Sequence, residues 1–81
     1  MMTRTELLAD IQPIIRAYSN EVADTTDSKL LPQSIEVHCK SCAFGGRFLE
    51  DIASYCRANF QPWIVMTDGD GSPVISLNYT E

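Results

Sequence analysis

Two stripes of apolar residues at three- and four-residue steps are the feature that most limits which folds this chain can adopt, because such a stripe forms one face of an α-helix. Thr3 and Glu6 have the spacing of a capping box, in which two side chains bond the free amides at a helix start. The sequence therefore predicts a helix over residues 3–22, kinked at Pro13, whose ring removes one helical hydrogen bond. The first stripe consists of Leu7, Leu8, Ile11, Ile14, Ile15, Tyr18 and Val22.

The second stripe predicts a helix over residues 42–60, with Ser41 as its N-terminal cap and Pro62 as its stop. Residues 23–34 follow the first helix, and their many Asp, Thr and Ser side chains favour a connecting loop because they bond nearby backbone groups. The second stripe consists of Phe44, Phe48, Leu49, Ile52, Ala53, Cys56 and Phe60.

Three short segments have the patterns of β-strands. Residues 34–39 alternate between apolar and polar side chains, which is typical of a half-buried strand. Residues 63–67 are apolar on both faces, which suits a central strand, and together with residues 74–79 they predict a hairpin over 63–79. On its second strand we expect inward-facing Ile75, Leu77 and Tyr79 and outward-facing Ser76 and Asn78.

These elements predict a single α+β domain over residues 1–81, since a chain of 81 residues supplies only one hydrophobic core. A strand, helix and strand in succession favour a right-handed crossover between parallel strands, and the final hairpin adds an antiparallel strand. We therefore expect the order α-β-α-β-β, with two helices packed on one face of a three-stranded mixed sheet. The opposite face of the sheet is expected to be partly bare.

The charge of the chain bears on its partners. Six Lys and Arg against eleven Asp and Glu give a net charge of −5. Direct binding of DNA or RNA depends on cationic side chains that neutralise phosphates, so the acidic balance disfavours it. A membrane is not an expected partner and the cytoplasm is the expected location, because no apolar run reaches about 18 residues and residues 1–6 lack the apolar core of a signal peptide.

Cys39 and Cys42 form a Cys-x-x-Cys pair at the predicted junction of strand and helix. A helix N-terminus and a neighbouring Lys40 both stabilise a thiolate, and the two-residue spacer allows a disulfide to close. This stretch resembles thioredoxin-like and selenoprotein W-like redox proteins, which place such a pair between strand and helix. The resemblance implies a thiol–disulfide activity with Cys39 as the attacking thiol and Cys42 as the resolving thiol.

Two other interpretations of the cysteines stay open. In the first, Cys39 and Cys56 are packing residues and Cys42 is an incidental thiol, because a free cysteine behaves as a small hydrophobic side chain. In the second, His38, Cys39, Cys42 and Cys56 supply the four ligands of a structural zinc site. Adjacent residues of a strand point to opposite faces, however, which makes convergence of His38 and Cys39 on one ion awkward. No cofactor is expected.

The hairpin offers a candidate surface for binding another protein. The segment 58–81 has no Lys or Arg, and the hairpin places two carboxylates near apolar and aromatic side chains. Such a surface can dock on a basic partner, because complementary charge speeds association and aromatic side chains anchor it. The expected binding residues are Asp68, Asp70, Trp63, Met66 and Tyr79.

The leading hypothesis is therefore a small acidic, non-enzymatic interaction module. One form of it is an inhibitor, of the kind that phages and plasmids encode, that occupies a basic nucleic-acid-binding surface of a host protein. The bare sheet face could also pair two copies of the chain into a homodimer. The alternative from a different class is the thiol–disulfide protein that uses Cys39 and Cys42.

Overall fold

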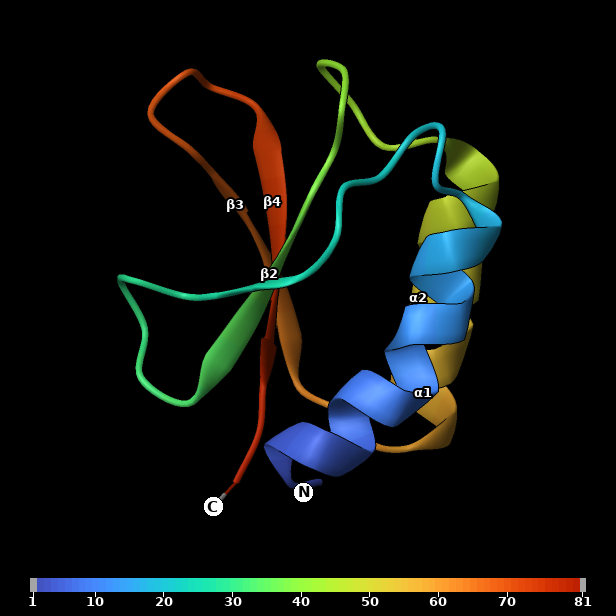
Figure 1. Cartoon of the computed structure of the whole chain (residues 1–81), viewed down its shortest axis with the longest axis vertical. Helices are drawn as coiled ribbons and strands as arrows, with labels where there is room; N and C mark the ends of the chain where they lie inside the picture. The colour runs from blue at the N-terminus through green and yellow to red at the C-terminus, as the bar shows by residue number, and fades with distance from the viewer. Residues whose placement is uncertain (1, 81) are drawn as a thin grey trace.

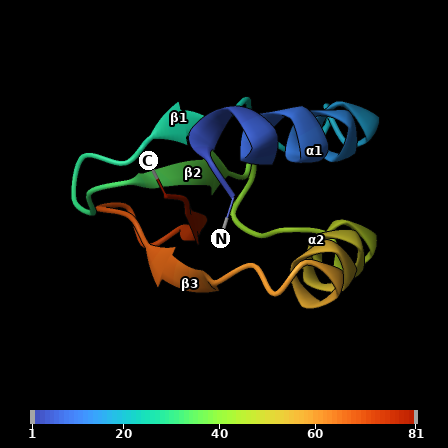
Figure 2. The same ribbon diagram turned by 90° about the horizontal axis from the view of Figure 1, so that it is seen from below.

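The computed structural model describes residues 2–80 and consists of two layers, a β-sheet and a pair of helices packed on one of its faces (Figure 1). Viewed from below, the two helices lie side by side on the same flank of the sheet (Figure 2). The α+β class is confirmed. The elements are α1 (Arg4–Ala17), β1 (Thr26–Asp27), β2 (Ser34–His38), α2 (Gly46–Ala58), β3 (Trp63–Thr67) and β4 (Pro73–Asn78).

The sheet differs from the predicted three-stranded mixed sheet. It has four strands in the order β1-β2-β4-β3, and every neighbouring pair is antiparallel. The expected direct pairing of β2 with β3 is wrong, because β4 returns from the hairpin and lies between them. The fourth strand, β1, comes from the predicted loop and pairs through Thr26 and Asp27 alone.

The central and edge positions are the reverse of those expected from the hairpin sequence. β4 is an interior strand, between β2 and β3, and Val74, Ile75, Ser76 and Leu77 are all buried. β3 lies at the edge, where Ile64 and Val65 are exposed. The run of apolar residues in β3 therefore does not reflect burial on both faces.

The capping box at the start of α1 is present as predicted. The Glu6 amide donates to Thr3 Oγ1 at 3.3 Å, and Glu6 Oε1 accepts from the Thr3 amide at 3.0 Å. These hydrogen bonds from Thr3 hold the pKa of the Glu6 carboxyl below its ordinary value of 4.5. α1 continues through Pro13 as one helix.

The predicted end of the first helix at residue 22 is wrong, because α1 stops at Ala17. The chain then turns, and the amides of Glu21 and Val22 both donate to the Tyr18 carbonyl. Val22 is buried as expected, but it reaches the core from an isolated bridge with Cys39. Its helical spacing from Tyr18 is therefore coincidental.

Replacing Thr3 with alanine should lower the free energy of unfolding by about 1 kcal/mol, the usual cost of removing an N-terminal cap. The loss should shrink as the pH falls below 4.5, because the lowered pKa of Glu6 means that its contribution is present above that pH and is lost on protonation. Urea denaturation at several pH values measures both effects. Thr5→Ala is the matched control, since Thr5 lies exposed in the first turn of α1, and an equal loss there would contradict the role of the cap.

The second helix begins and ends inside the predicted range 42–60. α2 begins at Gly46 with Gly45 as its cap, and the expected capping residue Ser41 instead donates its hydroxyl to the Ala43 carbonyl at 3.2 Å. At the other end the Gln61 amide donates to the Cys56 carbonyl at 2.8 Å. This bond closes a Schellman turn, which requires a residue with positive φ just before Gln61.

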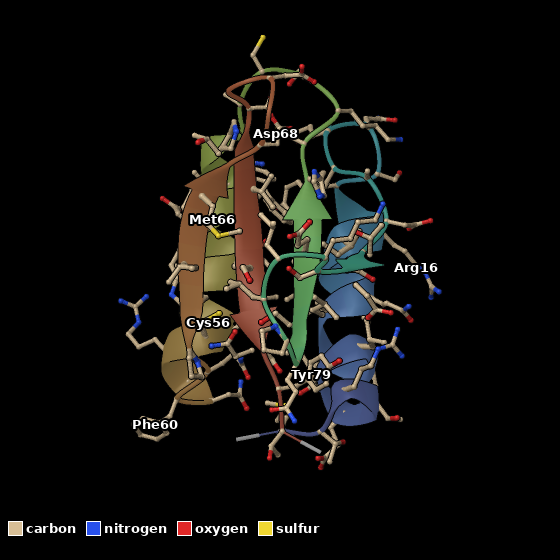
Figure 3. All side chains as sticks on the ribbon, turned by 90° about the vertical axis from the view of Figure 1, so that its left-hand side faces the viewer. Arg16, Cys56, Phe60, Met66, Asp68 and Tyr79 are labelled. Atoms are coloured by element: carbon tan, nitrogen blue, oxygen red, sulfur yellow. The ribbon has the colours of Figure 1, made fainter. Side chains whose placement is uncertain are left out.

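Phe60 occupies that position, with φ of 50°, and its side chain is 92% exposed. The prediction that Phe60 continues the buried stripe of the second helix is therefore wrong. The turn rotates its side chain away from the core, and Figure 3 shows the ring pointing outward at the end of the molecule.

The core lies between the two layers. It is built from the predicted helix stripes and from the alternating residues of β2 and β4, which confirms those parts of the pattern. The buried apolar side chains that form it are Leu7, Ile11, Ile15, Val22, Ile35, Val37, Phe48, Ile52, Cys56, Ile75 and Leu77.

Two tyrosine–aspartate hydrogen bonds join the helices on their outer side. Tyr18 Oη donates to Asp51 at 2.6 Å, and Tyr55 Oη donates to Asp10 at 3.0 Å. The bond to Asp51 raises the pKa of Tyr18, whereas burial, with help from Asp10, raises the pKa of Tyr55. Within residues 2–80, no helix is long and apolar enough to cross a membrane.

Candidate functional site

The sheet face opposite the helices is only partly bare. The segment between β1 and β2 crosses this face in front of β2 and reaches towards β4 (Figure 3). Ser76, which was expected to face solvent, is buried on this side of the sheet, and its hydroxyl has no hydrogen-bond partner among the described residues. The segment therefore covers part of the face and leaves the rest open.

The open part of the face contains a recess of about 500 Å³ between the β1–β2 segment and the β3–β4 hairpin. This volume is in the range of pockets that hold small ligands or side chains. Its apolar walls come from Leu30, Met66 and Val74. Its charged and titratable lining residues are Asp27, Lys29, Glu36, His38 and Asp68.

Glu36 is a sheltered carboxylate of the recess, with a side chain that is 14% exposed, against 63% for Asp27. Strand alternation places it on the open face beside His38, whose Nε2 lies 3.0 Å from Glu36 Oε1. The other oxygen, Oε2, accepts no hydrogen bond from any residue within 2–80. A partly desolvated carboxylate with a free oxygen can accept a hydrogen bond from a cationic group that enters the recess.

Asp68 stands at the rim, where it organises the hairpin turn. Its Oδ1 accepts the amides of Asp70 at 2.8 Å and Ser72 at 3.0 Å, as is typical of an Asx turn. Asp70 itself is exposed at the tip and does not line the recess. Of the two predicted acidic binding residues, only Asp68 therefore joins the site.

The predicted aromatic binding residues lie elsewhere. Met66 shares the recess with Asp68, but Trp63 projects from the helix-facing side of β3 and lines a groove with Cys56 and Phe60. Tyr79 lines a third hollow beside the β1–β2 segment. The expected set of five therefore divides among four places, with Asp70 alone at the hairpin tip.

The cysteines do not have the environment that a helix N-terminus provides. Cys42 lies four residues before the start of α2, and the Lys40 ammonium donates to the Ser19 carbonyl at 2.7 Å. Cys39 Sγ donates to the carbonyl of Ser41 at 2.9 Å. All three cysteines are free, and the thiol–disulfide function stays a prediction.

The four residues considered for zinc are dispersed. His38 contacts Glu36 on the open face, whereas Cys56 lies in the core on the other side of the sheet, where burial raises the pKa of its thiol to about 11. In the part of the chain that the structure describes, no group of three or more His, Cys, Asp or Glu side chains is placed to hold a metal ion.

Comparison of the chain with protein-family models, with curated proteins and with solved structures gives no match in any of the three. The site is therefore described from its own geometry. Sequence reasoning did not identify Glu36 or Leu30 as lining residues. The alternation of residues 34–39 placed Glu36 on the solvent side, but only the fold of the β1–β2 segment turns that position into the floor of a recess.

Proposed function

We propose that this protein is a non-enzymatic interaction module that binds a basic segment of a partner protein in the open-face recess. The observation that supports this most is the position of Glu36 beneath apolar walls, with one carboxylate oxygen free among the described residues. The walls suit the aliphatic stem of an arginine or lysine, and the carboxylate suits its charged end.

The charge around the recess agrees with this ligand. Asp27, Glu36 and Asp68 supply three carboxylates, against Lys29 and the titratable His38. Asp27 is partly neutralised by Arg4, whose Nε lies 3.1 Å from Asp27 Oδ1. The net charge of −5 adds a long-range attraction for a basic partner.

One form of the proposal is an inhibitor that occupies a basic nucleic-acid-binding surface of its partner. A partner surface that binds phosphates presents arginine and lysine side chains, and these are the groups that the recess suits. Size, acidity and this recess support the inhibitor form. In that form the protein and nucleic acid compete for the same surface.

A fluorescently labelled arginine-rich peptide tests the proposal. Anisotropy should report binding that weakens about tenfold between about 0.01 and 0.15 M salt, because screening removes charge attraction.

Asp68→Asn should weaken binding about threefold, since it removes a charge but keeps the turn-forming oxygen, and Asp70→Asn is its matched control. Adding the protein to a complex of the peptide with duplex DNA should release the DNA.

Binding that is indifferent to salt, or equal to that of a peptide with glutamine in place of arginine, would contradict the proposal. Equal effects of the Asp68 and Asp70 substitutions would show that only the overall charge matters and that the recess has no special role.

A further inference from the structure

The exposed apolar surface of the protein is concentrated at one edge of the sheet. Within residues 2–80, four large apolar side chains are exposed, and three of them, Phe60, Ile64 and Val65, fall within six residues in β3 and just before it. Ile64 and Val65 are 51% and 55% exposed. An unpaired strand edge also leaves backbone amides and carbonyls free to pair with another strand.

β3 lies at the edge of the sheet, but its amino-acid composition is typical of a central strand. Residues 63–67 are apolar apart from Thr67 and carry no charge, although charges, prolines and bulges commonly protect an edge strand from pairing. The other edge strand, β1, has only two residues, and Asp27 there is joined to Arg4. Of the two edges, β3 is therefore the one suited to accept another strand.

Phe60 adjoins this edge in an unfavourable backbone conformation. A bulky residue at φ of 50° is strained where glycine would be accommodated freely, and the exposed ring contributes little burial to the single chain. Such a ring is better explained by a contact outside the chain than by the stability of the chain itself.

We infer that β3 pairs with β3 of a second copy, in antiparallel orientation about Val65, and joins the two sheets into one. In this register no charged residue stands opposite another, since Asp68 of one copy faces Pro62 of the other. A strand within the combined sheet would then have the apolar environment on both sides that its composition favours. The facing pairs are Trp63 with Thr67, Ile64 with Met66, and Val65 with Val65.

A second copy fits this edge better than a basic partner does, because the strand offers no carboxylate to a cation. The two-fold axis of such a pair stands perpendicular to the sheet, so both recesses lie on the same face. This inference does not rest on the proposed function. Dimerisation uses the β3 edge of the sheet, whereas peptide binding uses the open face.

Sedimentation velocity over a concentration series tests the pairing. The wild-type protein should dimerise, and more strongly at about 0.5 M salt than at about 0.05 M, because salt screens the repulsion between two copies that each carry −5. V65K should weaken dimerisation at least tenfold, since it places two lysine side chains opposite each other. T26K on the exposed β1 edge is the matched control and should leave dimerisation unchanged.

A mixture of V65K with V65E tests most directly whether the two strands pair about residue 65. Each variant alone should be monomeric, and the mixture should form a heterodimer because residue 65 faces itself across the axis. A monomeric wild type at all concentrations, or a dimer that survives V65K, would overturn the inference. Peptide binding by V65K should equal that of the wild type, so failure here is distinguishable from failure of the proposed function.

Discussion

Replacing Phe48 with alanine should lower the free energy of unfolding by about 3–5 kcal/mol. Phe48 is fully buried between the layers, and its ring centroid lies 5.5 Å from those of both Tyr18 and Phe44. A domain of 81 residues has about 4–12 kcal/mol of stability in total, so the variant should be close to unfolding at 25 °C. Urea denaturation followed by circular dichroism measures the change.

The chain offers a control of the same residue type. Phe60→Ala removes an equal side chain from a site that is 92% exposed, and it should change the free energy of unfolding by less than about 0.5 kcal/mol. The measurement belongs at low protein concentration, where a dimer does not contribute. A loss at Phe60 as large as that at Phe48 would contradict the placement of the core.

Replacing Glu36 with glutamine should weaken the binding of an arginine-rich peptide at least tenfold. The substitution keeps the shape of the side chain but removes its charge, and hydrogen bonds to charged groups contribute about 1.5–3 kcal/mol. Glutamine can still form the hydrogen bond to His38, because its amide oxygen can accept from the ring N–H. Fluorescence anisotropy at low salt measures the dissociation constant.

Glu50→Gln is the control for net charge. Glu50 is exposed on α2, on the opposite side of the sheet from the recess, and its replacement changes the charge of the chain by the same amount. We expect less than a twofold effect there. Equal weakening by both substitutions would contradict a specific role of Glu36.

Much of the fold could be predicted from local chemistry. The capping box at Thr3, the buried stripes of both helices and the alternation of Ile35 and Val37 are set by residues close together in the sequence. The position of β4 between β2 and β3 could not be predicted in this way, because pairing between strands depends on contacts distant in the sequence. The apolar run of β3 was assigned to the centre of the sheet for the same reason.

The candidate site was predictable only in part. Met66 and Asp68 were identified from the composition of the hairpin, and both line the recess. Glu36 and Leu30 were not identified as site residues. They lie about thirty or more residues before Met66 and Asp68 in the chain, and they meet the hairpin only when the β1–β2 segment folds across the sheet. Trp63 was grouped with Met66 for its aromatic side chain, although residues three apart on a strand point to opposite faces, and Trp63 does lie on the helix-facing side.

Mapping the peptide on the protein by amide chemical shifts tests most directly whether the open face is the binding surface. On titration of ¹⁵N-labelled protein with the arginine-rich peptide, we expect the largest shift changes at Glu36, His38, Met66 and Asp68, with little change along α1 and α2. Changes centred on the helices, or no changes at peptide concentrations that saturate the anisotropy signal, would contradict binding in the recess.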